Sequence, residues 1–509
     1  MLSSTSIAES LEVLPQVEVV DSRLPSVFQV PSPIDRRLDR TEIDREVPAN
    51  TIELLQSFPS VDAQRAGGEG GLTFVSIRGG EPNFTLFLLD GIKLNDPTNS
   101  RGGGVNLNWI PQQMIDSIEV SARPASAVQG SDGLSGIVNI STRPFSGIEL
   151  NGDLNSQDSQ SGAFSFGGDV SDTLTASLMI GHEDKTSGAE RDSLQQSYLL
   201  GRAVAEPTDD VLLDLIFFRV DGDARSFPED SGGDRLAVIR APEKRDFRLE
   251  VIGLNGEWDL ADHLMLKGST SWSSHREKTD NPGIAAGVWD AVPAVSGKRN
   301  FDRLDGQLYL LAEPADDFSV TAGLAYDREK GSSDDVIDFG GFPVPADFDL
   351  ERSSWSVYSE LAYRPSPQIT MQSGLRHDMP DTESDQSSFS VGARYLIPQA
   401  DMTLSANYGE GYKLPSLFAL GHPLVGNPDL GPEFSKAIDL GVRKRWQSSG
   451  VVVGLSLFRN EYRDLIDFDP VLFTNVNRGR VKVQGADAQI DWQAHREVIT
   501  NAYLTYSDS

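Results

Sequence analysis

From about Gly147 to its last residue, the chain places apolar residues at alternate positions over many short stretches. One such stretch contains Leu174, Ala176, Leu178 and Ile180, with small polar residues between them. A period of two puts one set of side chains on a single face of a β-strand. The same alternation recurs at residues 264–272, 320–326, 391–395 and 402–408. Most of the chain is therefore predicted to form β-sheet.

Alternation of this kind fits two architectures. A transmembrane β-barrel turns its apolar side chains outward around a polar interior, whereas a β-sandwich turns them inward. The connections help to decide, because residues 314–317 and 364–368 form short turns while residues 226–244 and 277–298 form long polar segments. Short periplasmic turns and long outer loops are typical of outer-membrane barrels. The asymmetry therefore favours an antiparallel transmembrane barrel.

Composition excludes several other classes of protein. The 509 residues exceed what one hydrophobic core usually supports, so two or more domains are expected. No run approaches the roughly 20 apolar residues of a membrane-spanning helix, which excludes an α-helical membrane protein. The absence of cysteine excludes disulfide scaffolds and thiol chemistry. A net charge of −32 argues against nucleic acid as a partner.

The segment from Ser76 to Thr142 has a different sequence pattern, in which short apolar runs typical of strands are followed by glycine turns. Its three motifs occupy residues 76–80, 86–91 and 130–140, and Asp90-Gly91 predicts a tight turn after the second strand. Upstream, residues 42–58 predict an amphipathic helix that is interrupted at Pro48. Together these features predict a mixed α/β domain of about 120 residues.

The order and spacing of these motifs resemble the N-terminal plug of TonB-dependent outer-membrane receptors. Residues 408–415 and 426–433, and later residues 475–487, resemble two blocks in the barrels of the same family. The resemblance is best to the cobalamin receptors and their siderophore-receptor relatives. It implies a plug domain inside a large antiparallel barrel of about 22 strands in the cell outer membrane.

The resemblance divides the chain into three parts. Residues 1–30 are predicted to be a flexible arm, residues 31–147 the plug domain and residues 148–509 the barrel. At roughly 20 residues per strand with its connection, the barrel part holds about 18 strands, so we expect the barrel to be truncated at its C-terminal end. The first ten residues contain neither a basic nor an apolar segment, so no signal peptide is visible in this chain.

The arm contains a short alternating segment, Val17, Glu18, Val19 and Val20, at the position of the family's Ton box. An extended segment of β-branched residues can add to the edge of another protein's sheet. The resemblance implies that the periplasmic protein TonB captures this segment and displaces the plug. An ordinary first strand of the plug is the alternative interpretation.

Charged residues are the candidates for holding the plug in place. In the family, plug arginines meet barrel carboxylates, and Arg78 and Arg123 occupy the matching turns. Arg123 stands directly before a proline, without the intervening glycine of the family pattern. Glu433 and Asp439 are the candidate barrel partners. Ordinary solvated charges remain the alternative.

Polar residues at two plug apices are the candidate ligand contacts, because loops on a rigid scaffold often carry recognition. These candidates are Asn83, Phe84, Asn95, Asp96, Thr98, Asn99 and Arg101.

Two features raise the question of a bound metal, although no cofactor is required. Asp221, Asp223, Asp230 and Asp234 could supply carboxylates to calcium, but their spacing matches no fixed loop motif. His422 stands where haem receptors of the family carry an iron ligand, although a lone loop histidine is more often unliganded.

The resemblance implies a TonB-dependent importer of a bulky, scarce ligand such as cobalamin or a ferric siderophore, with haem import as the alternative within the family. The expected partners are TonB, the ligand, outer-membrane lipid and lipopolysaccharide, and the protein is expected to be a monomer. A secreted β-sandwich adhesin or carbohydrate-binding module is the alternative from another class. An enzyme is not expected, because the chain lacks HExxH, GxSxG and P-loop motifs.

Overall fold

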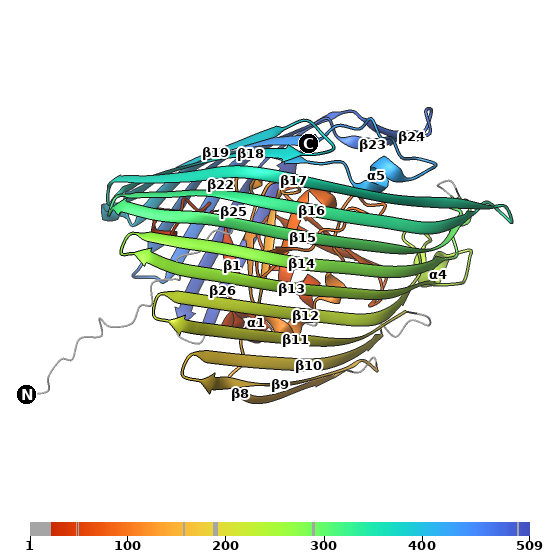
Figure 1. Ribbon diagram of the computed structural model, residues 1–509, viewed down its shortest axis with the longest axis horizontal. Coiled ribbons are helices and arrows are strands. Elements are labelled where there is room, and N and C mark those ends of the chain that lie inside the picture. The colour runs from red at the N-terminus through yellow and green to blue at the C-terminus, as the bar shows by residue number, and fades with distance from the viewer. Residues whose placement is uncertain are drawn as a thin grey trace, which may run out of the picture.

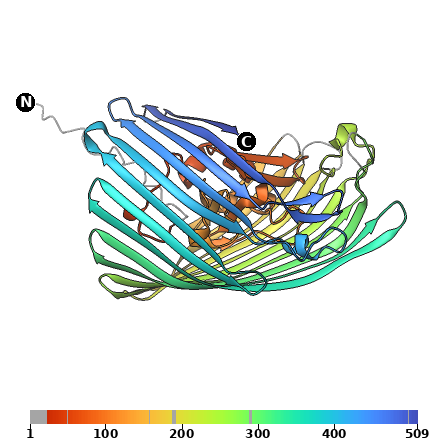
Figure 2. The ribbon, with the colours of Figure 1, turned by 90° about the horizontal axis from the view of Figure 1, so that it is seen from above.

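The computed structural model describes residues 22–46, 48, 50–155, 158–186, 192–287, 291–495 and 498–509. A wall of long strands curves around a smaller N-terminal unit (Figure 1). The view from above shows the same relation, with the N-terminal unit against the inner side of the wall (Figure 2). We call the two units the barrel and the plug.

The barrel contains seventeen of the strands that the structure describes, and their order follows the chain from β8 to β22 and continues with β25 and β26. The strands are β8 (Gly147–Leu154), β9 (Gln160–Ser171), β10 (Leu174–Thr186), β11 (Ser193–Thr208), β12 (Val211–Ser226), β13 (Glu243–Ala261), β14 (Leu264–Asn281), β15 (Ala294–Ala315), β16 (Phe318–Asp338), β17 (Pro343–Ser366), β18 (Ile369–Pro380), β19 (Gln386–Ile397), β20 (Met402–Lys413), β21 (Glu433–Trp446), β22 (Val451–Arg463), β25 (Arg480–His495) and β26 (Val498–Asp508). The predicted antiparallel barrel is confirmed.

Apolar side chains cover the outer face of the barrel. Leu308, Leu324 and Val357 form one row across β15, β16 and β17, and each side chain is more than two-fifths exposed. Leu215 and Leu254 form a similar pair across β12 and β13. Exposed apolar rows of this kind would be unfavourable in water but suit the lipid-facing surface of an outer-membrane barrel.

The two ends of the barrel differ, as the connections predict. At one end β15 joins β16 through Asp316-Asp317 and β13 joins β14 through Asp262-His263. At the other end several connections are long, and these contain α4 (Gly233–Leu236), α5 (Leu417–Gly421) and a hairpin of β23 (Ile466–Asp469) and β24 (Thr474–Asn477). We call the second end the outer end.

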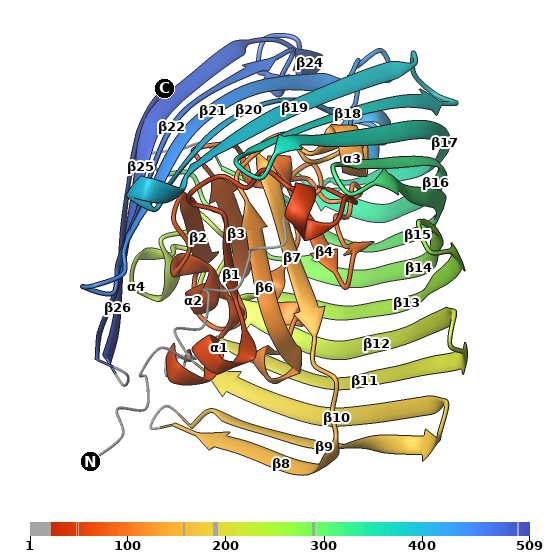
Figure 3. The same ribbon diagram turned by 90° about the vertical axis from the view of Figure 1, so that its left-hand side faces the viewer.

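The plug is built on a mixed five-stranded sheet in the order β1-β6-β7-β4-β5 (Figure 3). Its strands are β1 (Arg36–Leu38), β6 (Ile115–Ser121), β7 (Gly136–Thr142), β4 (Thr85–Leu89) and β5 (Ile92–Lys93), and only the β4–β7 pair is parallel. A separate hairpin joins β2 (Val61–Ala66) to β3 (Leu72–Ile77). Asp90 and Gly91 both have positive φ, at 50° and 82°, which forms the predicted tight turn between β4 and β5.

Short helices fill the spaces beside the plug sheet. The predicted helix over residues 42–58 is divided into α1 (Arg40–Glu46) and α2 (Thr51–Gln56), because Pro48 cannot continue a helix. The Asn50 side chain accepts a hydrogen bond from the Glu53 backbone N–H and caps α2. The remaining helices of the plug are α3 (Ser126–Gln129), η1 (Ser26–Phe28), η2 (Pro82–Phe84), η3 (Leu107–Trp109) and η4 (Gln112–Met114), while η5 (Pro398–Ala400) lies in the turn between β19 and β20 of the barrel. Among the described residues, no helix is long and apolar enough to cross a membrane.

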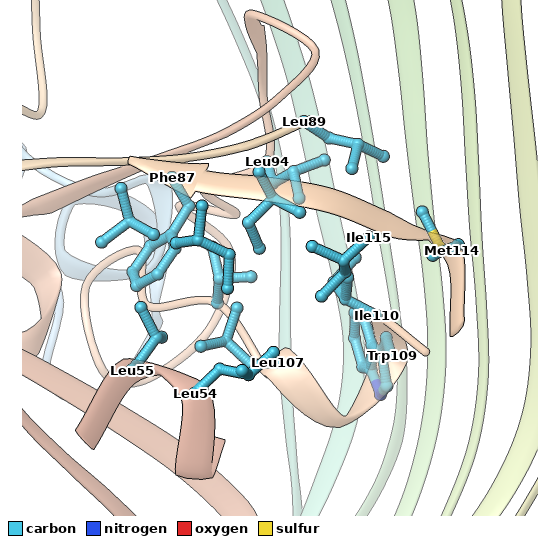
Figure 4. Packing of buried hydrophobic residues seen from close by; sticks show 14 of the residues in the cluster. Leu54, Leu55, Phe87, Leu89, Leu94, Leu107, Trp109, Ile110, Met114 and Ile115 are labelled. Atoms are coloured by element: carbon cyan, nitrogen blue, oxygen red, sulfur yellow. The ribbon is translucent and has the colours of Figure 1, made fainter. Parts of the chain in front are cut away.

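The apolar core of the plug continues into the barrel wall. Figure 4 shows its plug part, with Leu54 and Leu55 of α2, Phe87 of β4 and Trp109 of η3. The barrel members of the same cluster are Ala163, Met179, Leu194, Tyr198, Leu200, Phe218, Val220, Ala224, Phe247, Leu249 and Val251. These residues come from β9 to β13, so one sector of the wall shares its core with the plug.

The structure corrects the predicted extent of the flexible arm. Within residues 22–30, the Arg23 backbone N–H donates to Glu360 at 2.8 Å, and its guanidinium donates to the Val128 carbonyl at 2.6 Å and to Gln307 at 2.7 Å. Val30 is fully buried. This segment is therefore part of the packed plug, because its polar groups find partners on the wall that the sequence does not reveal. The barrel begins at Gly147.

Candidate functional site

Arg78 lies at the centre of the contact between the plug and the wall. Its side chain is buried, and it donates to Asp439 on β21 at 2.7 Å and to Asp487 on β25 at 3.0 Å. The guanidinium also reaches Ser456 at 3.1 Å and lies 4.3 Å from the centre of the Phe458 ring. The structure therefore brings together Arg78 and Asp439, two of the residues proposed from the sequence.

The backbone at Arg78 turns so that the side chain points to the wall. Arg78 has a φ of 50° and Gly79 a φ of 71°, and both values lie in the left-handed region that glycine adopts most easily. The Arg78 backbone N–H donates to the Ser60 carbonyl at 2.9 Å, which fixes this turn after β3. The turn at Arg78 and Gly79 thus directs the Arg78 guanidinium out of the plug and toward the barrel wall.

The carboxylates around Arg78 are satisfied by further donors. Ser60 and Thr505 donate to Asp487 at 2.7 and 2.8 Å, and Ser32 donates to Asp439 at 3.0 Å. A buried ion pair stabilises a fold only when such hydrogen bonds offset the cost of removing the charges from water. The sequence analysis did not propose Asp487 as a partner of Arg78. Asp487 is nevertheless the last residue of the segment 475–487 that resembles a barrel block of the family.

Glu433 does not meet a plug arginine as predicted. Arg123 forms an ion pair with Asp35 at 3.0 Å, within the plug, and it faces Asp439 across a small cavity. Glu433 pairs with Lys413 at 3.3 Å, directly across from it on β20. The structure therefore corrects the pairing proposed for Glu433, because its cross-strand neighbour Lys413 forms the ion pair with it.

Three of the candidate ligand contacts are structural. Phe84 is buried and stacks on Tyr462 of the wall, with ring centres 5.4 Å apart. Asn95 is buried; its side chain accepts from the Phe87 backbone N–H and donates to the carbonyls of Thr85 on β4 and Gly103 in its own loop. Thr98 is buried and donates to Asp96 at 2.6 Å. These residues shape the apex and are not available to a ligand.

The remaining candidates lie nearer the surface of the apex. Arg101 is exposed, lies 4.9 Å from the Phe74 ring centre and forms an ion pair with Glu229 of the β12–β13 connection. The Asn99 side chain holds the same loop by donating to the Asp96 carbonyl at 2.9 Å. The Asn83 side-chain oxygen has no hydrogen-bond partner among the described residues. Because that oxygen is buried, Arg101 is the candidate of this group with an exposed charged side chain.

A second buried charge cluster, which the sequence did not indicate, supports the apex. Glu329 on β16 lies between Arg303 on β15, at 3.0 Å, and Arg352 on β17, at 2.6 Å. Arg303 also donates to the Asn95 carbonyl at 3.0 Å, and Arg352 donates to the Pro415 carbonyl at 2.6 Å. The cluster thus ties the apex loop and an outer connection to the same part of the wall.

The four candidate calcium ligands are not gathered at one point. Asp221 pairs with Arg219 and Arg248 on the outer face, and Asp223 stands opposite another carboxylate on β13. Asp230 and Asp234 lie in the β12–β13 connection. Within the described ranges, no group of three or more histidine or carboxylate side chains is arranged to hold a metal ion.

His422 has a structural role at the end of α5. Its Nδ1 atom accepts from the Leu424 and Val425 backbone N–H groups at 3.3 and 3.4 Å, and its ring packs on Phe418 at 4.7 Å. Burial lowers the pKa of His422. These contacts describe a structural role for His422 and do not point to a haem ligand. The Ton box, Val17 to Val20, lies outside the described residues.

Comparison with known proteins gives the same division of the chain. Residues 26–137 match the TonB-dependent receptor plug domain, and residues 186–509 match the TonB dependent receptor-like β-barrel. The chain belongs to the TonB-dependent receptors. It is accordingly an outer-membrane transport protein and not an enzyme, and the family implies both interaction with TonB and binding of a ligand.

Individual relatives are distant. Two vitamin B12 transporters named BtuB from Vibrio vulnificus, strains YJ016 and CMCP6, are 25% and 24% identical over 88% and 79% of this chain. The matches span 71% and 63% of those proteins. The siderophore receptor PirA from Acinetobacter baumannii superposes with a TM-score of 0.74 at 18% identity, over 94% of this chain and 80% of that one. The superposition shows the fold alone.

Proposed function

We propose that this receptor imports a bulky ligand without net negative charge, and that cobalamin or a related corrinoid is the leading candidate. TonB would supply the energy by pulling on Val17 to Val20, and the receptor would act as a monomer. The names of the two Vibrio relatives motivate the corrinoid. The charge of the outer end is the observation in this chain that supports it.

Carboxylates predominate in the described outer connections. The acidic residues there are Asp158, Asp192, Glu229, Asp230, Asp234, Asp381, Glu383, Asp385, Asp429, Asp464, Asp467 and Asp469, and the basic residues are Arg235, Arg240 and Arg478. Charges of one sign around an entrance raise the local concentration of oppositely charged solutes and repel those of the same sign. A polyanionic ferric siderophore would approach this end against repulsion, whereas a neutral corrinoid would not.

Contacts at the plug apex agree with this argument. The cation at the apex, Arg101, is already paired with Glu229, so an anionic ligand would have to displace that carboxylate. Burial, followed by the negative charges of Glu433 and Asp467, raises the pKa of Glu81 at the neighbouring apex. Negative charge therefore accumulates where a ligand would enter.

A titration of the purified receptor in detergent tests the proposal. Cobalamin, ferric siderophores of different charge and haem are each added at low and high salt, with and without calcium. We expect submicromolar binding of cobalamin. Its affinity should change little with salt, because salt screens interactions between charges and this ligand has no net charge. Tighter binding of an anionic siderophore at low salt would overturn the proposal and favour the ferric-siderophore alternative.

A further inference from the structure

A buried histidine lies where the wall meets the plug apex. His275 on β14 is 3% exposed, and neither of its ring nitrogen atoms is hydrogen-bonded to any described residue. Most buried polar side chains in folded proteins have at least one such partner, so an exception calls for an explanation. The rings of Trp109 and Phe301 flank the imidazole, with ring centres 5.8 and 5.9 Å away. The imidazole therefore lies in a mostly apolar site.

A carboxylate of the plug faces this imidazole. Asp96 lies in residues 95–104, which we call the apex loop, and its Oδ2 atom is 3.7 Å from His275 Nδ1, beyond hydrogen-bonding distance. The other carboxylate oxygen accepts from the Thr98 backbone N–H at 2.8 Å and from the Thr98 hydroxyl at 2.6 Å. Within the described ranges, no arginine or lysine forms an ion pair with Asp96. One carboxylate oxygen is therefore left for a partner on the wall.

The other charges around His275 already have partners. Besides Asp96, the charged groups that face the imidazole are Arg303 on β15 and Glu277 and Arg276 on β14. Each of these three forms an ion pair with another residue, and the pairs are Arg303–Glu329, Glu277–Arg299 and Arg276–Asp302. Burial disfavours a charge on the imidazole, whereas the carboxylates of Asp96 and Glu277 favour it. Asp96 is thus the carboxylate that a charged His275 would meet.

We propose that His275 is a proton sensor that fixes the apex loop to the wall. Histidine is the side chain whose charge ordinarily changes between about pH 5 and pH 8. When His275 is protonated, both ring nitrogens carry hydrogen, and Nδ1 donates to Asp96 once the gap of 3.7 Å closes by about 1 Å. A hydrogen bond between charged groups is about twice as strong as a neutral one. Uptake of a proton by the wall therefore restrains a loop of the plug.

The apex loop passes this restraint on to the outer end. Arg303 donates to the Asn95 carbonyl at 3.0 Å, and the Phe418 backbone N–H on α5 donates to the Pro97 carbonyl at 3.1 Å. Asp96 stands between these two contacts, so its bond to His275 orders this segment and, through Pro97, holds α5 against it. When the imidazole is neutral, the segment keeps only the other two contacts. The inference depends on the contact between plug and wall and not on which ligand is imported.

Amide hydrogen exchange of the full chain in detergent tests the inference. Exchange in residues 95–104 is followed by mass spectrometry at about pH 5 and about pH 8, the limits of the usual histidine range. Each rate is divided by the intrinsic rate of the unstructured chain at the same pH, which gives a protection factor. In the unmodified protein we expect protection to be at least about fivefold greater at the lower pH, because a charged hydrogen bond replaces a missing one.

Two variants remove the sensor from opposite sides. His275→Gln keeps an amide that can donate to Asp96 but does not titrate, so protection of the apex loop should be the same at both pH values. Asp96→Asn keeps an oxygen that accepts from Thr98, but its amide nitrogen cannot accept from the imidazolium. We expect this variant to lose the pH dependence as well.

The matched control is His182→Gln. His182 on β10 is exposed and contacts the Ser197 hydroxyl at 2.9 Å, so this change removes a histidine away from the apex loop. The control should keep the full pH dependence, and all variants should keep the heat-modifiable gel mobility of a folded barrel. If His275→Gln does not fold, Asp96→Asn decides alone. Protection that does not change with pH in the unmodified protein, or a change that persists in either sensor variant, would overturn the inference.

Discussion

On the side of β10 to β13 the plug meets the wall mainly with apolar side chains, whereas on the side of β18 to β25 ion pairs and hydrogen bonds add to the contact. Trp109 stacks on Phe247 with ring centres 4.9 Å apart on the first side, and both belong to the shared core. Arg78 binds Asp439 and Asp487 on the second side. We call these the apolar face and the polar face of the plug.

The difference indicates how a seated plug can still be moved. Separating the apolar face exposes hydrophobic area to water, at about 25 cal/mol for each Å². Separating the polar face exposes charged and hydrogen-bonding groups that water solvates again. When TonB pulls the arm, we therefore expect the polar face to open first and the apolar face to act as the hinge.

Cross-linking should give the largest effect. The chain contains no cysteine, so no native thiol can compete with an introduced pair of cysteines for disulfide formation. A Cβ built on Gly374 of β18 lies 3.6 Å from the Ala127 Cβ on α3, which suits a disulfide. We expect oxidised Ala127→Cys/Gly374→Cys to lose TonB-dependent uptake while still binding ligand, and a reductant to restore uptake.

The control cross-link lies at the end of β12, beside the apolar face. A Cβ on Gly67 would lie 3.7 Å from that of Ser226, and we expect oxidised Gly67→Cys/Ser226→Cys to keep most of its uptake. Gly67 has a φ of 93°, so the reduced form of the same variant serves as the baseline for strain. If both cross-links block uptake equally, the two faces separate together and the comparison fails.

Removing the Arg78 charge should give a smaller effect, on stability. In Arg78→Met two buried carboxylates lose their cation, which we expect to cost about 3–5 kcal/mol of plug stability. The additional changes Asp439→Asn and Asp487→Asn should recover a large part of this loss, because amides need no counter-charge. Urea unfolding of the plug, followed by its sensitivity to protease, measures both.

Trp109→Ala is the corresponding change on the apolar face. It should also cost about 3–5 kcal/mol, through the lost burial and the cavity that remains. Its cost should not depend on salt, since no charge is involved. Recovery of Arg78→Met by added salt alone, or no recovery in the triple variant, would contradict the assignment of the polar face to buried ion pairs.

The smallest expected effect is a pH dependence at Asp90. Burial raises the pKa of Asp90 above its ordinary 3.8, although hydrogen bonds from Thr142 act against the shift. Above pH 3.8 the unfolded chain releases this proton before the folded chain does, so the stability of the plug falls as the pH rises from 3.8 through the raised pKa.

Asp90→Asn should remove this slope, because an amide does not titrate. Its side-chain oxygen can still accept a hydrogen bond from Thr142, so the turn between β4 and β5 should persist. Unfolding measured from pH 3 to pH 7 in both proteins compares the two slopes. Identical slopes would show that Asp90 is not responsible for the pH dependence.

The architecture was predictable because each strand and turn is specified locally. Alternation marked the strands of the wall, Asp90-Gly91 marked a tight turn and Pro48 divided a helix. The site was less predictable. Arg78 and Asp439 could be proposed from motifs, whereas the pairing of Glu433 with Lys413 depends on the register of β20 against β21.

The sequence by itself determined which segments form strands and turns, because these follow from side-chain periodicity and turn residues over a few positions, and the family resemblance supplied the division into plug and barrel. Only the tertiary structure decided which charges meet. Arg78 is separated from Asp439 by 361 residues and from Asp487 by 409, yet all three share one buried site.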